Sequence, residues 1–158
     1  GNDEESKQEG TEKSDDDSID TNISEGDVEV DANGNPISST STDELFTQLR
    51  MDLNDQRSKL KEQYESIMSS DSASVEEKNE AFEAMTRLDE IAYKESLLEK
   101  VIQSENSYTD VFVRAEDDVV HVTVKANEVT PTETVNIMQM VRDEFGEIPV
   151  DVKFQPTE

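Results

Sequence analysis

The stretch TDVFVRAEDDVVHVTVKA, residues 109–126, decides the fold of this chain. Apolar and polar residues alternate on both sides of a short acidic turn, and this pattern predicts two strands, Thr109–Glu116 and Asp118–Ala126. Successive side chains of a strand point to opposite faces, so each strand should place one alternating set on the core. Those sets are Val111, Val113 and Ala115 in the first strand and Val120, Val122 and Val124 in the second.

A helix and a third strand follow this pair. Thr130-Pro131-Thr132-Glu133 combines an N-cap, a proline at the first helical position and a capping box. The helix should run to about Phe145 and end at Gly146 in a left-handed conformation. Its core stripe is Ile137, Met138, Val141 and Phe145, and the final strand alternates through Val150, Val152 and Phe154.

Two long helices should precede the strands. Capping boxes at Ser41–Glu44 and Ser74–Glu77 mark their starts, and the polar stretch Ser69–Ser74 separates them. The first helix has a seam with heptad spacing, formed by Phe46, Leu49, Leu53, Gln56, Leu60, Gln63 and Ile67. The second carries Ala81, Met85, Leu88, Ala92, Leu98 and Ile102. We therefore predict an α+β fold, in which a long helical hairpin projects beyond a three-stranded sheet with helices packed on one face.

Composition divides the chain in two. Its 158 residues carry a formal net charge of −26, and residues 1–42 hold 13 acidic residues, two basic residues and no aromatic one. Such a segment cannot bury enough apolar surface to offset its ordering entropy, so we predict a disordered acidic leader at 1–42 and a folded domain at 43–158. The negative charge argues against binding to nucleic acid or to an anionic membrane. With no cysteine, the chain has neither disulfides nor thiol chemistry.

No catalytic, cofactor-binding or metal-binding set stands out, so the sequence favours an interaction domain over an enzyme. The candidate partner surface is the sheet face opposite the core, with Phe112 as an exposed aromatic anchor. The other members of this candidate site are Arg114, Val119, His121 and Lys125. The sheet edges are a second candidate, Asp118–Ala126 among them. Val135 and Met140, on the flank of the last helix, are candidates for lateral contact between copies.

Several stretches resemble the stage III sporulation protein AH family of endospore-forming bacteria. They are EAMTRLDEIA at 83–92, residues 95–102, TDVFVRAEDDVVHVTV at 109–124 and TPTETVNIMQMVRDEFG at 130–146. The resemblance covers nearly the whole chain. It implies a ring-building motif, known from secretion-system and flagellar basal-body proteins, whose helix–strand–strand–helix–strand order fits residues 75–154. It carries no list of site residues.

The resemblance also implies a function. Family members have one N-terminal membrane helix in the mother-cell membrane, and their soluble part faces the space between mother cell and forespore. There they bind stage II sporulation protein Q from the forespore in a channel-like complex. This chain lacks the anchor helix and begins at Gly1, so we expect a soluble fragment. We therefore predict a non-enzymatic assembly domain that needs no cofactor, binds this partner and stacks into a ring.

Three other functions are alternatives to this one. The first is a small α/β adaptor for an unrelated protein. The second is an RNA-binding KH module, which needs a basic face and a G-x-x-G loop that the chain does not have. The third is a small hydrolase that uses carboxylates, and nothing in the sequence selects a pair of them.

Overall fold

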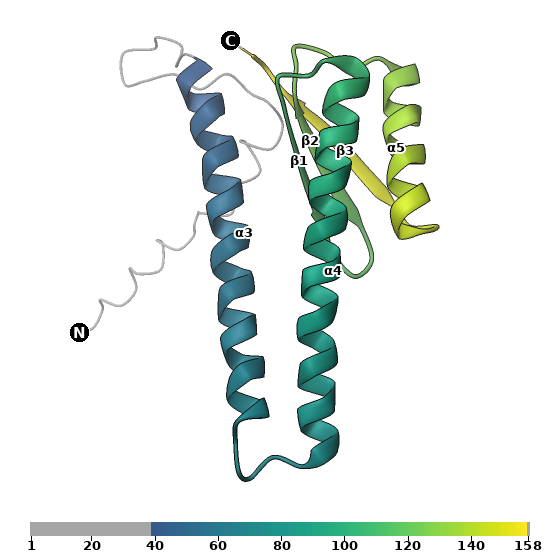
Figure 1. Cartoon of the computed structure of the whole chain (residues 1–158). Coiled ribbons are helices and arrows are strands. Elements are labelled where there is room, and N and C mark those ends of the chain that lie inside the picture. The colour runs from purple at the N-terminus through teal and green to yellow at the C-terminus, as the bar shows by residue number, and fades with distance from the viewer. Residues whose placement is uncertain (1–38, 158) are drawn as a thin grey trace, which may run out of the picture.

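The computed structural model describes residues 39–157 and has the predicted α+β architecture (Figure 1). Its elements are α3 (Ser39–Met68), α4 (Val75–Asn106), β1 (Asp110–Ala115), β2 (Val120–Lys125), α5 (Pro131–Phe145) and β3 (Val150–Gln155). The predicted order of elements is confirmed. The prediction that the leader is disordered concerns residues that mostly lie outside the described range, although α3 already begins at Ser39, before the predicted domain start at residue 43.

The three strands form one sheet in the order β1-β2-β3. Strands β1 and β2 are antiparallel, with Val113 opposite Val122. Strand β3 returns through α5 and lies parallel to β2, with Val152 opposite Val122. The central strand is therefore β2, so the prediction that treated Asp118–Ala126 as a sheet edge is wrong. Edge positions belong to β1 and β3.

The core lies between the sheet, α4 and α5. Its buried members are Leu98, Ile102, Tyr108, Val111, Val113, Ala115, Val120, Val122, Val124, Ile137 and Val141, which confirms the predicted alternation in β1 and β2. Val150 and Val152 pack against this core, but Phe154 is 42% exposed, so its predicted core position is wrong. It lies near the end of an edge strand, where fewer neighbours can cover a side chain.

Local signals fixed two of the three helix starts. Ser74 accepts the backbone N–H of Glu77, Thr130 accepts that of Glu133, and both capping boxes are complete. After α5, Gly146 has the positive φ of 84° expected for glycine, but its ψ of −168° is extended rather than left-handed helical. The left-handed residue is Ser107 at the end of α4, with φ 57° and ψ 37°.

The hairpin of α3 and α4 extends well beyond the sheet, as predicted (Figure 1). Its half-buried positions keep an alternating three–four spacing but differ from the predicted seam at several residues; they include Arg50, Leu53, Arg57, Leu60 and Tyr64. Gln56 and Gln63 are exposed. The residues that follow them, Arg57 and Tyr64, are half-buried and lie on the side of α3 that faces α4. The predicted positions of both glutamines in the seam are wrong.

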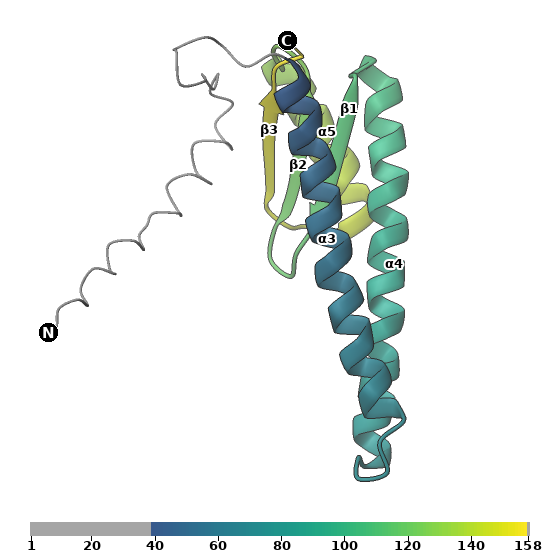
Figure 2. The same ribbon diagram turned by 90° about the vertical axis from the view of Figure 1, so that its left-hand side faces the viewer.

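Helix α3 also covers part of the sheet face that the sequence analysis left open. Figure 2 shows α3 in front of the sheet and α5 behind it, with α4 running along β1. Phe46 of α3 is 2% exposed although it lies outside the main core, because it packs on this second face. The helices therefore occupy both faces of the sheet, and only part of the outer face remains open.

Candidate protein-interaction surface

Phe112, the predicted anchor, is buried. It lies on the predicted outer face, but its exposed fraction is only 5%. The Arg50 guanidinium of α3 lies 5.8 Å from the centroid of the Phe112 ring and 5.9 Å from that of Phe46. The two rings and the guanidinium form a small second cluster under α3. The prediction that Phe112 is exposed is wrong, because α3, which is distant in the sequence, covers this strand.

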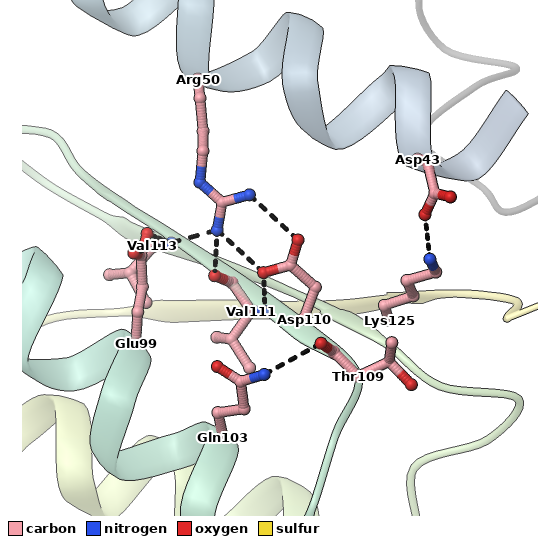
Figure 3. A network of polar contacts seen from close by, with 9 residues as sticks. All are labelled: Asp43, Arg50, Glu99, Gln103, Thr109, Asp110, Val111, Val113 and Lys125. Atoms are coloured by element: carbon pink, nitrogen blue, oxygen red, sulfur yellow. Dashed lines mark hydrogen bonds and ion pairs between the residues drawn. The ribbon is translucent and has the colours of Figure 1, made fainter. Parts of the chain in front are cut away.

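Lys125 is buried by the same helix. Its exposed fraction is 8%, and its Nζ pairs with Asp43 in the second turn of α3 (Figure 3). The predicted place of Lys125 on an open face is therefore wrong. The ion pair holds α3 against the end of β2, so the Lys125 ammonium group does not face solvent.

The outer edge of β1 is closed by carboxylates. Three backbone N–H groups on this edge would be free donors, and each finds an acidic side chain. Val111 donates to Asp110 at 2.8 Å, Val113 to Glu99 at 2.9 Å and Ala115 to Glu95 at 2.7 Å (the first two in Figure 3). Glu95 and Glu99 lie one turn apart on α4, so the helix takes the place of a neighbouring strand.

Two arginines of α3 balance these carboxylates. Arg50 donates to both oxygens of Asp110 at 3.0 Å and to the Val111 carbonyl at 2.7 Å (Figure 3). Arg57 donates to both oxygens of Glu95 at 2.6 and 2.8 Å. The hydrogen bonds that Arg50 donates to Asp110 raise the pKa of Arg50. Burial raises the pKa of Glu99 despite the opposing effects of the Val113 N–H and Arg50. The β1 edge is thus unavailable to a partner strand.

The open part of the outer face carries a row of polar side chains across all three strands, in which carboxylates alternate with Arg114, His121 and Lys153. Arg114 pairs with Glu116 at 3.0 Å, and His121 Nε2 lies 3.5 Å from the other Glu116 oxygen. His121 Nδ1 lies 3.0 Å from Asp151 Oδ2, which Lys153 also contacts at 3.3 Å. We call these five residues the outer-face row. Burial alone would raise the pKa of Asp151, but His121 and Lys153 outweigh it and lower that pKa.

The residues predicted to contact a partner therefore fall into a buried group and an accessible group. Arg114, Val119 and His121 are half-buried and accessible, and the first and third of them meet through Glu116. Glu116 and Asp151 are members of this row that the sequence did not indicate. Strand order was needed to find them, because Asp151 reaches His121 only when β3 lies beside β2.

The two residues predicted to make lateral contacts between copies also differ in exposure. Val135 is 62% exposed on α5, whereas Met140 packs against the core, so its predicted exposure is wrong. On the other side of the sheet, β3 has β2 as its only neighbouring strand within residues 39–157.

Within the described residues, no three His, Cys, Asp or Glu side chains gather as a set that could hold a metal ion. No helix in the described range combines the length and apolar character needed to cross a bilayer.

Comparisons with known proteins agree with the resemblance found in the sequence. The family model described as "SpoIIIAH-like protein" matches residues 1–152. Stage III sporulation protein AH of Bacillus subtilis (strain 168) is 36% identical over 155 residues, covering 98% of this chain and 69% of the relative. A chain in the solved SpoIIQ–SpoIIIAH pore-forming complex is similar at 38% identity and a TM-score of 0.66, covering 71% of this chain and 97% of that one. The chain therefore belongs to the SpoIIIAH-like family.

Proposed function

We propose that this chain is a protein-interaction domain of a sporulation channel complex, and that it binds a SpoIIQ-type protein. The observation that carries this proposal is the similarity to a chain solved in complex with SpoIIQ, at 38% identity over 97% of that chain. The domain would act from the mother-cell membrane and face the space between mother cell and forespore, where the partner is presented from the opposing membrane.

The outer-face row is the part of the domain that suits this role. The chain as a whole carries a net charge of −26, which repels most acidic partners. The row balances acidic Glu116 and Asp151 with Arg114 and Lys153, so a partner can approach it with little repulsion. Exposed ion pairs add little stability, so the arrangement is better explained by recognition than by folding.

The test measures binding of a soluble SpoIIQ domain by isothermal titration calorimetry. Arg114→Glu places a third acidic charge in the row and should weaken binding about tenfold or more, because like charges across an interface are strongly unfavourable. Val119→Asp, on the same face, should weaken it similarly. Arg87→Glu is the matched control, since Arg87 is an exposed arginine on the projecting part of α4. It should bind as the wild type does.

Circular dichroism melts would show that each variant is folded. If Arg114→Glu and Val119→Asp fold and still bind with wild-type affinity, the outer-face row is not the interface. If the wild-type chain shows no binding to SpoIIQ, the proposed partner is wrong.

Stacking of copies into a ring is part of the same proposal. Val135 is the accessible candidate for such contacts, since its side chain projects from α5 away from the core. Val135→Glu should then reduce assembly of complexes larger than one copy of each protein, while leaving the affinity for SpoIIQ unchanged.

A further inference from the structure

The outer edge of β3 is a strand edge that the fold leaves unpaired within the described residues. The Val120 N–H donates to Pro149 and the Ala126 N–H donates to Gln155, which fixes the phase of the β2–β3 ladder. In a parallel ladder of this phase, the backbone groups of Val150, Val152 and Phe154 point away from β2. In contrast with β1, no helix runs along this edge (Figure 2).

The sequence of this edge is complementary to itself. If two copies of β3 meet antiparallel with Val152 on the two-fold axis, Asp151 of each copy lies opposite Lys153 of the other. The same register places Val150 opposite Phe154. The outward backbone groups then fall at hydrogen-bonded pairs, and the charged residues at the closer non-hydrogen-bonded pairs.

We propose that two copies of this chain pair through β3 in this register. The two three-stranded sheets then form one continuous six-stranded sheet, in which the two β3 strands are antiparallel at the two-fold axis. The contact uses Asp151 and Lys153 of the outer-face row and so overlaps the proposed SpoIIQ site there, whereas Arg114, Val119 and the β1 edge take no part in it. It is a direct contact between copies through backbone hydrogen bonds.

Charge selects this register over its neighbours. Shifting one copy by two residues in either direction keeps the outward backbone groups opposite one another. However, one shift places Asp151 opposite Asp151 of the second copy, and the other places Lys153 opposite Lys153. Like charges directly opposite each other destabilise a strand pair. Shifts by one residue fail for another reason, since they bring outward backbone groups opposite inward ones.

Two side chains in the single copy are suited to this contact. Phe154 is 42% exposed, and Val150 of the second copy would cover it. The contacts of Asp151 with His121 and Lys153 both fall on Oδ2, so Oδ1 can face the Lys153 of the second copy without breaking them.

The first test is charge reversal, read by sedimentation velocity at protein concentrations up to about 0.5 mM, where even weak pairs with a Kd near 1 mM are populated. Asp151→Lys alone and Lys153→Asp alone should each lower the association constant about tenfold or more, because two attractive pairs become repulsive. The double variant carrying both changes should restore association. That variant lacks the contact of Asp151 with His121 but can re-form the 151–153 pair within one copy, so melting curves of all variants at low concentration separate effects on the single copy from effects on pairing.

The second test reads the register with cysteines, which the wild-type chain does not contain. Asp151→Cys and Lys153→Cys chains are mixed under mild oxidation. Facing residues of a non-hydrogen-bonded pair have Cα atoms about 4.5 Å apart, within the range of disulfides. Identical positions lie on a diagonal, about 7–8 Å apart. The mixture should therefore give mainly the mixed dimer, which also keeps one Asp151–Lys153 pair.

The proposal is overturned if the wild-type chain stays monomeric at the highest concentration. It is also overturned if the single charge reversals leave association unchanged, or if the two cysteine chains cross-link equally with themselves and with each other. A third variant, Val152→Pro, removes an outward N–H that the β2–β3 ladder does not use, so the fold should persist while pairing is lost. If Val152→Pro stays folded and self-associates as the wild type does but no longer binds SpoIIQ, the edge belongs to that partner and self-pairing through β3 is wrong. Loss of SpoIIQ binding in Arg114→Glu with pairing intact would leave both proposals standing separately.

Discussion

At the scale of single residues, the contact between Arg57 and Glu95 is the most consequential ion pair in the described structure. Glu95 is 4% exposed, receives two hydrogen bonds from Arg57 and accepts the Ala115 N–H. Removing one member of a buried ion pair leaves the other charge buried without a partner, which costs about 3–5 kcal/mol. Arg57→Ala should therefore lower the free energy of unfolding by about 3 kcal/mol, measured by urea denaturation.

The matched control joins the same two helices. Lys61 Nζ lies 2.7 Å from Asp89, but both side chains are largely exposed, at 41% and 65%. Exposed pairs contribute about 0–1 kcal/mol, so Lys61→Ala should change stability by less than about 1 kcal/mol. Equal effects of the two changes would mean that burial does not decide the strength of these pairs.

Residue-scale prediction from the sequence failed where a distant element set the environment. Alternation in β1 assigned Phe112 to the correct face, but nothing within the strand indicates that Phe46 and Arg50 cover that face. Glu95 has the same chemistry as the many solvated acids of this chain, and only the packing of α4 on β1 distinguishes it. By contrast, Val113 and Val122 depend on their own strands, and their burial was predicted.

At the scale of elements, the upper part of α3 is attached to the sheet by few contacts. Phe46 is the buried apolar residue of this helix within the described range, and Arg50 and the Asp43–Lys125 pair support it. Deleting a buried aromatic side chain costs about 3–5 kcal/mol locally. Phe46→Ala should therefore increase amide hydrogen exchange in the first turns of α3, while the amides of Val122 and Val124 stay protected.

Met51→Ala is the control for that experiment, because Met51 lies on the same helix and is 53% exposed. It should leave exchange in α3 nearly unchanged. If Phe46→Ala instead raises exchange equally in β2 and α3, the helix is part of one cooperative unit with the core and is not a separately attached arm.

The elements also show which signals are local. The capping boxes at Ser74 and Thr130 predicted helix starts because the cap and its acceptor lie three residues apart in the sequence. The box at Ser41 did not set the start of α3, which begins at Ser39. Strand order was beyond the sequence, since pairing of β3 with β1 or with β2 preserves the same alternation. That order decided which candidate residues could meet.

At the scale of the whole molecule, charge dominates. A net charge of −26 makes the compact state repel itself, and this repulsion acts over distances that salt can screen. Raising NaCl from about 10 mM to about 150 mM shortens the Debye length from about 30 Å to about 8 Å. Arg57 and Glu95 are 16% and 5% exposed and are therefore screened much less than the surface acids. The relief of repulsion among the surface acids should therefore exceed the weakening of this ion pair, and the melting temperature should rise with salt.

A variant with fewer surface acids separates this effect from general salt effects. Glu80, Glu105 and Glu147 are exposed, and changing all three to glutamine removes charge without touching the core, the β1 edge or the outer-face row. The variant should melt at a higher temperature than the wild type at about 10 mM NaCl and should respond less to added salt, because less repulsion remains to be screened. Parallel salt responses of the two proteins in calorimetry would show that ion-specific effects, rather than self-repulsion, govern stability. A fall in melting temperature with salt in the wild type would show instead that the arginine–carboxylate contacts of α3 outweigh the repulsion of the whole chain.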